Sequence, residues 1–163
     1  MAHVLTMIGV DLTLKCINSI TGTTQTIYGL ISGIKGEKQI EVTKFLTDTD
    51  IEATIKVLES LLQELDVDKH TSKTLNLCLT EMEEVIKEIN VILKMIHDRL
   101  LFNNSLYVLK SWRSWKFTEE IEKLGKLNEI LHNRWKLLRD VLAIKESLQK
   151  QEIVAQVEEE SLL

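Results

Sequence analysis

The stretch LNLCLTEMEEVIKEINVILKMIHDRL, residues 75–100, decides the fold. Its apolar side chains recur at alternating steps of four and three residues, which is the a/d pattern of a helix that packs along its whole length. These side chains are Leu75, Leu79, Met82, Ile86, Ile89, Leu93, Ile96 and Leu100, with Ile92 on the flank. Because a single helix with so long an apolar seam is not stable alone, the pattern predicts partner helices.

The composition of the chain is that of a globular protein with one domain. Of its 163 residues, 44% are hydrophobic and 28% are charged, which is ordinary for such a protein. The chain contains no proline, and proline interrupts helices, so the composition predicts long helices joined by short connections. The net charge of −5 disfavours broad nucleic-acid binding, which depends on neutralising phosphates. We therefore expect no nucleic-acid partner.

The two cysteines, Cys16 and Cys78, each lie within an apolar helical pattern. We expect both to be reduced core thiols, which places the protein in a reducing compartment inside the cell, the cytoplasm. A disulfide between them is the alternative. The first residues lack the basic region of a secretory signal, and no later helix has the run of apolar residues that a membrane span requires.

Residues 16–34 carry no charged side chain. The segment approaches the length of a membrane span, but its threonines and glycines make it only moderately hydrophobic. We interpret residues 3–34 as one helix, or two helices broken near Gly22, buried against the bundle; insertion into a membrane and an oligomer interface are the alternatives. The side chains that would enter the core or the lipid are Ile17, Ile20, Ile27, Tyr28, Leu30, Ile31 and Ile34.

Two further apolar seams complete the bundle. One runs from Ile51 to Leu65 after a polar link at residues 35–44, and the other runs from Phe117 to Leu142. The short connection at residues 66–72 predicts that the second and third helices are antiparallel neighbours, with Thr71 or Ser72 capping the third. The sequence thus predicts an all-α fold: an antiparallel four-helix bundle over residues 1–149, an aromatic elbow between the last two helices, and an acidic C-terminal extension over residues 150–163.

The elbow, SLYVLKSWRSWK at residues 105–116, is the most distinctive local feature. It interleaves cations and aromatic rings, a composition suited to stacking, to phosphate contacts or to membrane interfaces. Alternatively, the two tryptophans plug the end of the bundle while the cations extend outward. The candidate interaction residues are Lys110, Trp112, Arg113, Trp115 and Lys116.

No pattern for catalysis or for cofactor binding occurs in the sequence. The four histidines form no i, i+4 zinc pair, and the cysteines form no CxxC. Glu129 and His132 make one Glu-x-x-His pair, whereas di-iron bundles use two such pairs plus two further glutamates. Phosphate-binding glycine loops and the GxSxG nucleophile motif are also absent. We therefore expect no enzyme activity, no metal and no cofactor.

The order of these features resembles two groups of proteins. The uncharged residues 16–34 and the helix lengths over residues 4–146 resemble the HeLo-type domains of fungal cell-death proteins and of the mixed-lineage kinase-like pseudokinase. That resemblance implies a four-helix bundle whose N-terminal region attacks membranes. The chain is also similar, around residues 101–117, to small all-helical proteins of unassigned role from large DNA viruses.

From the strong packing seams, the lack of a chemical site and the apolar tail, we predict a non-catalytic interaction or assembly protein. Its partner would be another protein or a second copy of itself. The alternative, which follows from the HeLo-type resemblance, is a membrane-active and membrane-peripheral bundle that inserts its apolar N-terminal segment into lipid.

Overall fold

The computed structural model describes the backbone of residues 2–106 and 116–162, and the side chains of these ranges from Met7 onward. Every regular element within these residues is a helix. The elements in chain order are α1 (Ala2–Gly36), α2 (Ile40–Asp48), α3 (Ile51–Glu64), α4 (Val67–His70), α5 (Lys73–Ser105) and α6 (Thr118–Ser161). The fold is therefore all-α, with four main helices and two short ones.

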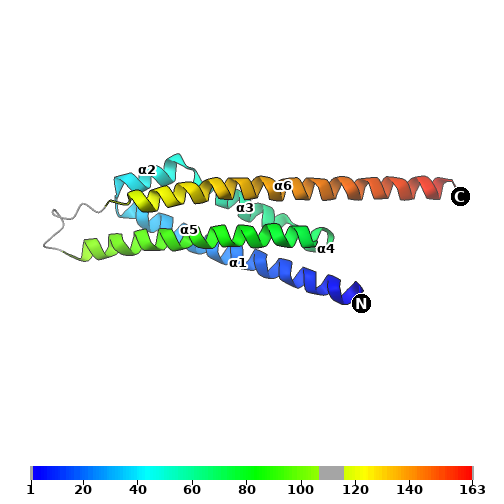
Figure 1. Ribbon diagram of the computed structural model, residues 1–163, viewed down its shortest axis with the longest axis horizontal. Helices are drawn as coiled ribbons and strands as arrows, with labels where there is room; N and C mark the ends of the chain where they lie inside the picture. The colour runs from blue at the N-terminus through cyan, green and yellow to red at the C-terminus, as the bar shows by residue number, and fades with distance from the viewer. Residues whose placement is uncertain (1, 107–115, 163) are drawn as a thin grey trace.

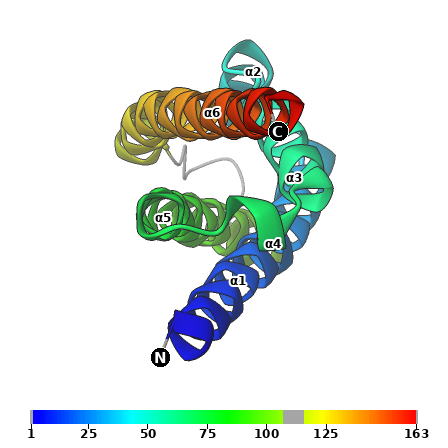
Figure 2. The ribbon, with the colours of Figure 1, turned by 90° about the vertical axis from the view of Figure 1, so that its right-hand side faces the viewer.

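The four main helices surround one core (Figures 1 and 2). Helices α1 and α5 run in the same direction, and α3 and α6 run opposite to them. Helix α5 packs chiefly along α1 and α6, whereas α3 packs chiefly along α1. The second and third predicted helices, α3 and α5, are antiparallel as expected, but the expectation that they are close neighbours is wrong. Helix α3 has 14 residues, so the two long helices on either side of it in the chain pair with each other instead.

Helix α1 is unbroken, so the alternative of two helices broken near Gly22 does not occur. The core positions of α1 continue through this point at alternating steps of four and three, with two of them occupied by the buried threonines Thr13 and Thr24. The hydroxyls of Thr23 and Thr26 donate to the carbonyls of Ser19 and Gly22, four residues back. Because these polar groups are satisfied within the helix, they do not interrupt it.

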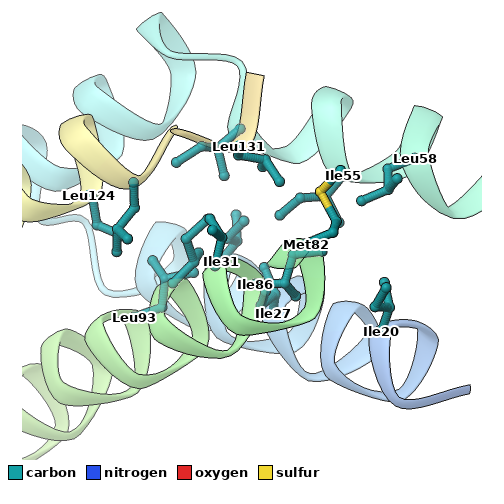
Figure 3. Packing of buried hydrophobic residues seen from close by; sticks show 14 of the residues in the cluster. Ile20, Ile27, Ile31, Ile55, Leu58, Met82, Ile86, Leu93, Leu124 and Leu131 are labelled. Atoms are coloured by element: carbon teal, nitrogen blue, oxygen red, sulfur yellow. The ribbon is translucent and has the colours of Figure 1, made fainter. Parts of the chain in front are cut away.

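The core is built from isoleucine and leucine side chains of α1, α3, α5 and α6 (Figure 3). All eight a/d residues of the 75–100 stretch are buried, as the sequence predicts. Met82 of α5 and Ile55 of α3 point toward one another, and Ile31 of α1 faces the same interior. The seam of α3 is confirmed as well, since Ile55 and its apolar neighbours along that helix are buried.

A line of polar contacts joins the parallel pair α1 and α5. Ser19 donates to Glu83 over 2.5 Å between Oγ and Oε1, and Cys16 Sγ lies 3.8 Å from Thr80 Oγ1. Further pairs join Thr13 to Asn76 at one end and Glu37 to Asn104 at the other. The partners are 63 to 67 residues apart throughout, which is the signature of two helices running side by side in one direction.

Gly33 of α1 packs against the His97 ring of α5. A Cβ atom at this position would lie 2.5 Å from Nε2 of His97 and 2.9 Å from its Cδ2. By contrast, a Cβ at Gly22 or Gly29 would meet nothing within 4 Å. The absence of a side chain at Gly33 is therefore what lets the imidazole ring of α5 pack against the backbone of α1.

The connections differ in part from those predicted. Residues 35–44 are not a simple polar link, because α2 begins at Ile40, after the side chain of Gln39 accepts a hydrogen bond from the Val42 amide over 2.6 Å. Ser72 caps α5 as predicted, accepting from the Leu75 amide over 3.1 Å. Helix α6 begins at Thr118 and continues to Ser161 without interruption.

Candidate interaction surface

Helix α6 extends past the end of the bundle (Figure 1). Its last contacts with the bundle are made to α4: the Lys145 ammonium donates to the His70 carbonyl, and Gln149 Nε2 donates to the Lys69 carbonyl over 3.2 Å. From residue 150 to residue 162 every side chain is exposed. We call residues 150–161 the projecting segment, and at 1.5 Å per residue it is roughly 18 Å long.

Helix α6 carries a second apolar row besides its core face. The core face consists of Leu124, Leu127, Leu131, Leu138 and Leu142. About 100° around the helix, a second row follows the same alternation of four and three residues along the whole helix. Its members, which we call the α6 stripe, are Ile130, Arg134, Leu137, Val141, Ile144, Leu148, Gln151, Ala155, Glu158 and Leu162.

Most apolar members of the stripe are open to solvent, whereas Val141 is partly buried against the core. Leu137, Ile144 and Leu148 are 47%, 61% and 55% exposed. Single exposed leucines are normal on protein surfaces, but a continuous row of them is typical of a surface that meets another molecule. The stripe spans the bundle-packed half of α6 and the projecting segment alike.

A groove between α5 and α6 widens this surface next to the stripe. The groove has a volume of about 200 Å³. It is lined by Thr74, Leu77, Cys78 and Glu81 of α5 and by Arg134, Leu137 and Val141 of α6. Leu77 is 61% exposed at its edge, so the apolar surface reaches from α6 onto α5.

Charge is sparse on the stripe and is placed near its two ends. Arg134 forms an ion pair with Glu81, with 2.9 Å between Nη2 and Oε2, and Glu158 begins the acidic run of residues 158–160. In the groove, burial raises the pKa of the Cys78 thiol, although the Arg134 charge opposes this shift. The thiol is therefore protonated at neutral pH and lines the groove as a small apolar group.

Three further apolar side chains of the projecting segment lie outside the α6 stripe, and one of them, Val154, borders it beside Gln151 and Glu158. Ile153, Val154 and Val157 are 58%, 56% and 60% exposed. Sequence periodicity singles out these three residues as a helical continuation, and the structure places them on α6 beyond its last contact with the bundle. They do not belong to the α6 stripe, because they occupy different angular positions on the helix.

The candidate site residues that were predicted from the sequence do not belong to the α6 stripe. Four elbow residues, Lys110, Trp112, Arg113 and Trp115, fall outside the described residues, and the fifth, Lys116, is exposed just before the buried Phe117. Of the N-terminal set, the isoleucines are buried and the two others are partly buried. The buried ones are Ile17, Ile20, Ile27, Ile31 and Ile34, and the partly buried ones are Tyr28 and Leu30.

Sequence reasoning missed the α6 stripe because it followed the core seam of the same helix. The signal is nevertheless present, since Ile130, Leu137 and Ile144 recur at intervals of seven residues. When one helix carries two apolar rows, the sequence does not show which row faces the core. Only the packing of the helix shows which row faces inward.

Neither a membrane span nor a metal site emerges from the residues described. Among residues 2–106 and 116–162, no helix combines the length and the apolar character needed to cross a membrane. The same residues contain no group of three or more histidine, cysteine, aspartate or glutamate side chains arranged to hold a metal ion.

Comparison with known proteins finds no family model, curated protein or solved structure that matches the chain.

Proposed function

We propose that this protein is a non-catalytic helical interaction and assembly protein, and that α6 is the element through which it docks. The observation that carries the proposal is the continuation of α6 beyond the bundle with its apolar side chains uncovered. Ile153, Val154 and Val157 on the projecting segment are each more than half exposed, as are Ile144 and Leu148 just before it.

Physical considerations support a docking role for this segment. A helix of about 12 residues is marginal in water when nothing packs against it. Burying one valine, leucine or isoleucine side chain contributes about 1.5–3 kcal/mol. Covering the exposed apolar side chains of the projecting segment with another helix therefore supplies the stabilisation that the bundle does not provide beyond Gln149.

The packing of α1 supports assembly over the membrane-active alternative. Ile20, Ile27 and Ile34 have no exposed surface. Releasing them into lipid would first require opening the α1–α5 pair, at a cost of about 1.5–3 kcal/mol for each side chain removed from the core. Dye release from anionic vesicles tests the alternative directly, and leakage by the folded protein would favour it over assembly.

Removal of the projecting segment tests the proposal. A chain ending at residue 149 keeps every α6 contact described above, so circular dichroism should show a folded bundle. We expect this truncation to abolish association, measured as self-association by light scattering and as partner capture by affinity pull-down from the native source.

A substitution variant separates loss of the helix from loss of its apolar side chains. Ile153→Ser, Val154→Ser and Val157→Ser combined with Leu148→Ser keep the length of α6 but remove apolar surface, whereas Gln156→Ser changes an exposed polar residue of the same segment. Association should fall in the first variant and be unchanged in the second. If the truncated chain associates as the full chain does, α6 is not the docking element.

A further inference from the structure

The α6 stripe is self-complementary when read in opposite directions, and from this we infer that its occupant is the α6 stripe of a second copy, running antiparallel. The inference rests on the proposed function and names the partner. The stripe reads Ile, Arg, Leu, Val, Ile, Leu, Gln, Ala, Glu, Leu from residue 130 to residue 162. A two-fold axis at the level of residue 146 pairs residues that lie equally far before and after residue 146 in the two copies.

The apolar positions match in this register, except that Val141 meets Gln151. Ile144 of one copy meets Leu148 of the other on both sides of the axis, so that the four largest central side chains form one cluster. Leu137 meets Ala155, a large residue against a small one, and Ile130 meets Leu162, 40% and 86% exposed in the single chain. This alternation is the antiparallel form of the a/d packing of coiled coils.

The charges select the antiparallel direction. Arg134 is the one cation of the stripe and Glu158 its one anion, and the register that pairs the apolar residues also places these two opposite each other, twice per dimer. A parallel pair would instead set Arg134 against Arg134 and Glu158 against Glu158. Like charges directly opposite disfavour association, whereas opposite charges favour it and set the register.

One further cation lies near the two-fold axis. Lys145 lies beside the stripe, and in this register it approaches its own copy in the partner. Its ammonium donates to the His70 carbonyl of its own α4, so the charge is directed into its own bundle and away from the seam.

The arrangement covers part of the surface that the single chain leaves open. Because the axis lies at the end of the bundle, the projecting segment of each copy runs along the bundle-packed half of α6 in the other. There it borders the α5–α6 groove, where Leu77 is 61% exposed. The interface is isologous, since each copy contributes both a groove and a segment that covers one.

Sedimentation equilibrium on the full chain tests the inference. We expect a mass of twice the chain's 18.8 kDa at concentrations from roughly 1 to 200 μM. Ile144→Glu and Leu148→Glu each place a carboxylate in the central cluster and should weaken the dimer by about 100-fold or more. Both positions are mostly exposed in the single chain, so circular dichroism should show an intact fold.

Gln156→Glu is the matched control, because Gln156 is exposed on the same helix but lies off the stripe. The dimer should be unaffected by it. Glu158→Arg should weaken the dimer roughly tenfold by setting like charges opposite each other. Arg134→Glu added to the same chain should restore it, with Glu81→Gln included because Arg134 pairs with Glu81 in the native chain. In a parallel dimer Glu158→Arg would change nothing, because it would replace one like pair with another.

Each contrary result overturns a defined part of the inference. A monomer at all concentrations removes the second copy as occupant; the proposed function then stands if partner capture still depends on the projecting segment, and falls with it if capture does not. A dimer broken by Gln156→Glu but not by Ile144→Glu removes the stripe. A dimer insensitive to the charge variants removes the antiparallel register.

Discussion

Replacing Gly33 by alanine probes the packing of the His97 ring against the backbone of α1. A Cβ at Gly33 would lie 2.5 Å from the nearest ring atom, which is well inside van der Waals contact, so the ring or the helices must move. Gly29, one turn earlier on α1, offers a matched control, because a Cβ there meets nothing within 4 Å.

The two substitutions share one favourable term and differ in one unfavourable term. Alanine inside a helix is more favourable than glycine by about 1 kcal/mol, and this gain applies at both positions. Forcing an extra carbon into a packed interface costs about 1–3 kcal/mol, and this cost applies only at Gly33. We therefore expect Gly29→Ala to raise the free energy of unfolding by about 1 kcal/mol, and Gly33→Ala to leave it unchanged or lower it by up to about 2 kcal/mol.

Urea denaturation followed by circular dichroism measures both changes, with all variants at one protein concentration so that association affects them equally. The decisive comparison uses a His97→Ala background. Without the ring, Gly33→Ala should become stabilising, as Gly29→Ala is, and the double-mutant cycle should give a coupling energy of about 1 kcal/mol or more. Equal stabilisation by the two alanines in the native background would refute the close parallel pairing of α1 and α5.

Four other substitutions have defined outcomes in unfolding experiments. Thr13→Val should lower the free energy of unfolding by about 1–2 kcal/mol, because Asn76 of α5 loses its hydrogen bond with the buried hydroxyl. Ser72→Ala should cost about 1 kcal/mol as a lost N-cap, whereas Asp50→Ala should cost less, since Asp50 makes no side-chain cap hydrogen bond. Hydrogen bonds from Lys35 and then Lys56 lower the pKa of Glu52. The stabilisation that ionised Glu52 contributes is therefore present above its unfolded-state pKa and is lost as the pH falls through its lower folded-state pKa. Glu52→Gln should make the thermal stability less dependent on pH in that acidic range.

The helices themselves were largely predictable from sequence. The seam from Leu75 to Leu100 consists of large aliphatic side chains at regular spacing, and such a pattern has one stable solution. Phe117 and Thr118 mark the start of α6 where the acidic residues after them indicate it. The α3 seam was equally legible for the same reason.

The relation between the helices was not predictable, because polar residues carry it. Thr13 and Thr24 occupy core positions of α1 and hide its seam from a search for apolar residues, so one helix and two helices broken near Gly22 were both left open. The pairing of Ser19 with Glu83 joins residues 64 apart, and no local pattern announces such a contact. The start of α2 was missed because Gln39 is not among the residues favoured as N-caps.

The parallel pairing of α1 and α5 also has a consequence for folding during translation. Translation proceeds at about 5–20 residues per second, and the principal partner of α1 lies 64 residues downstream of its contacts, so on a ribosome α1 is synthesised roughly 3–13 seconds before α5. During that interval only α2, α3 and α4 are there to shield its isoleucine face. The threonines in that face lower its apolar content, and so make the nascent helix less prone to aggregate before its partner emerges.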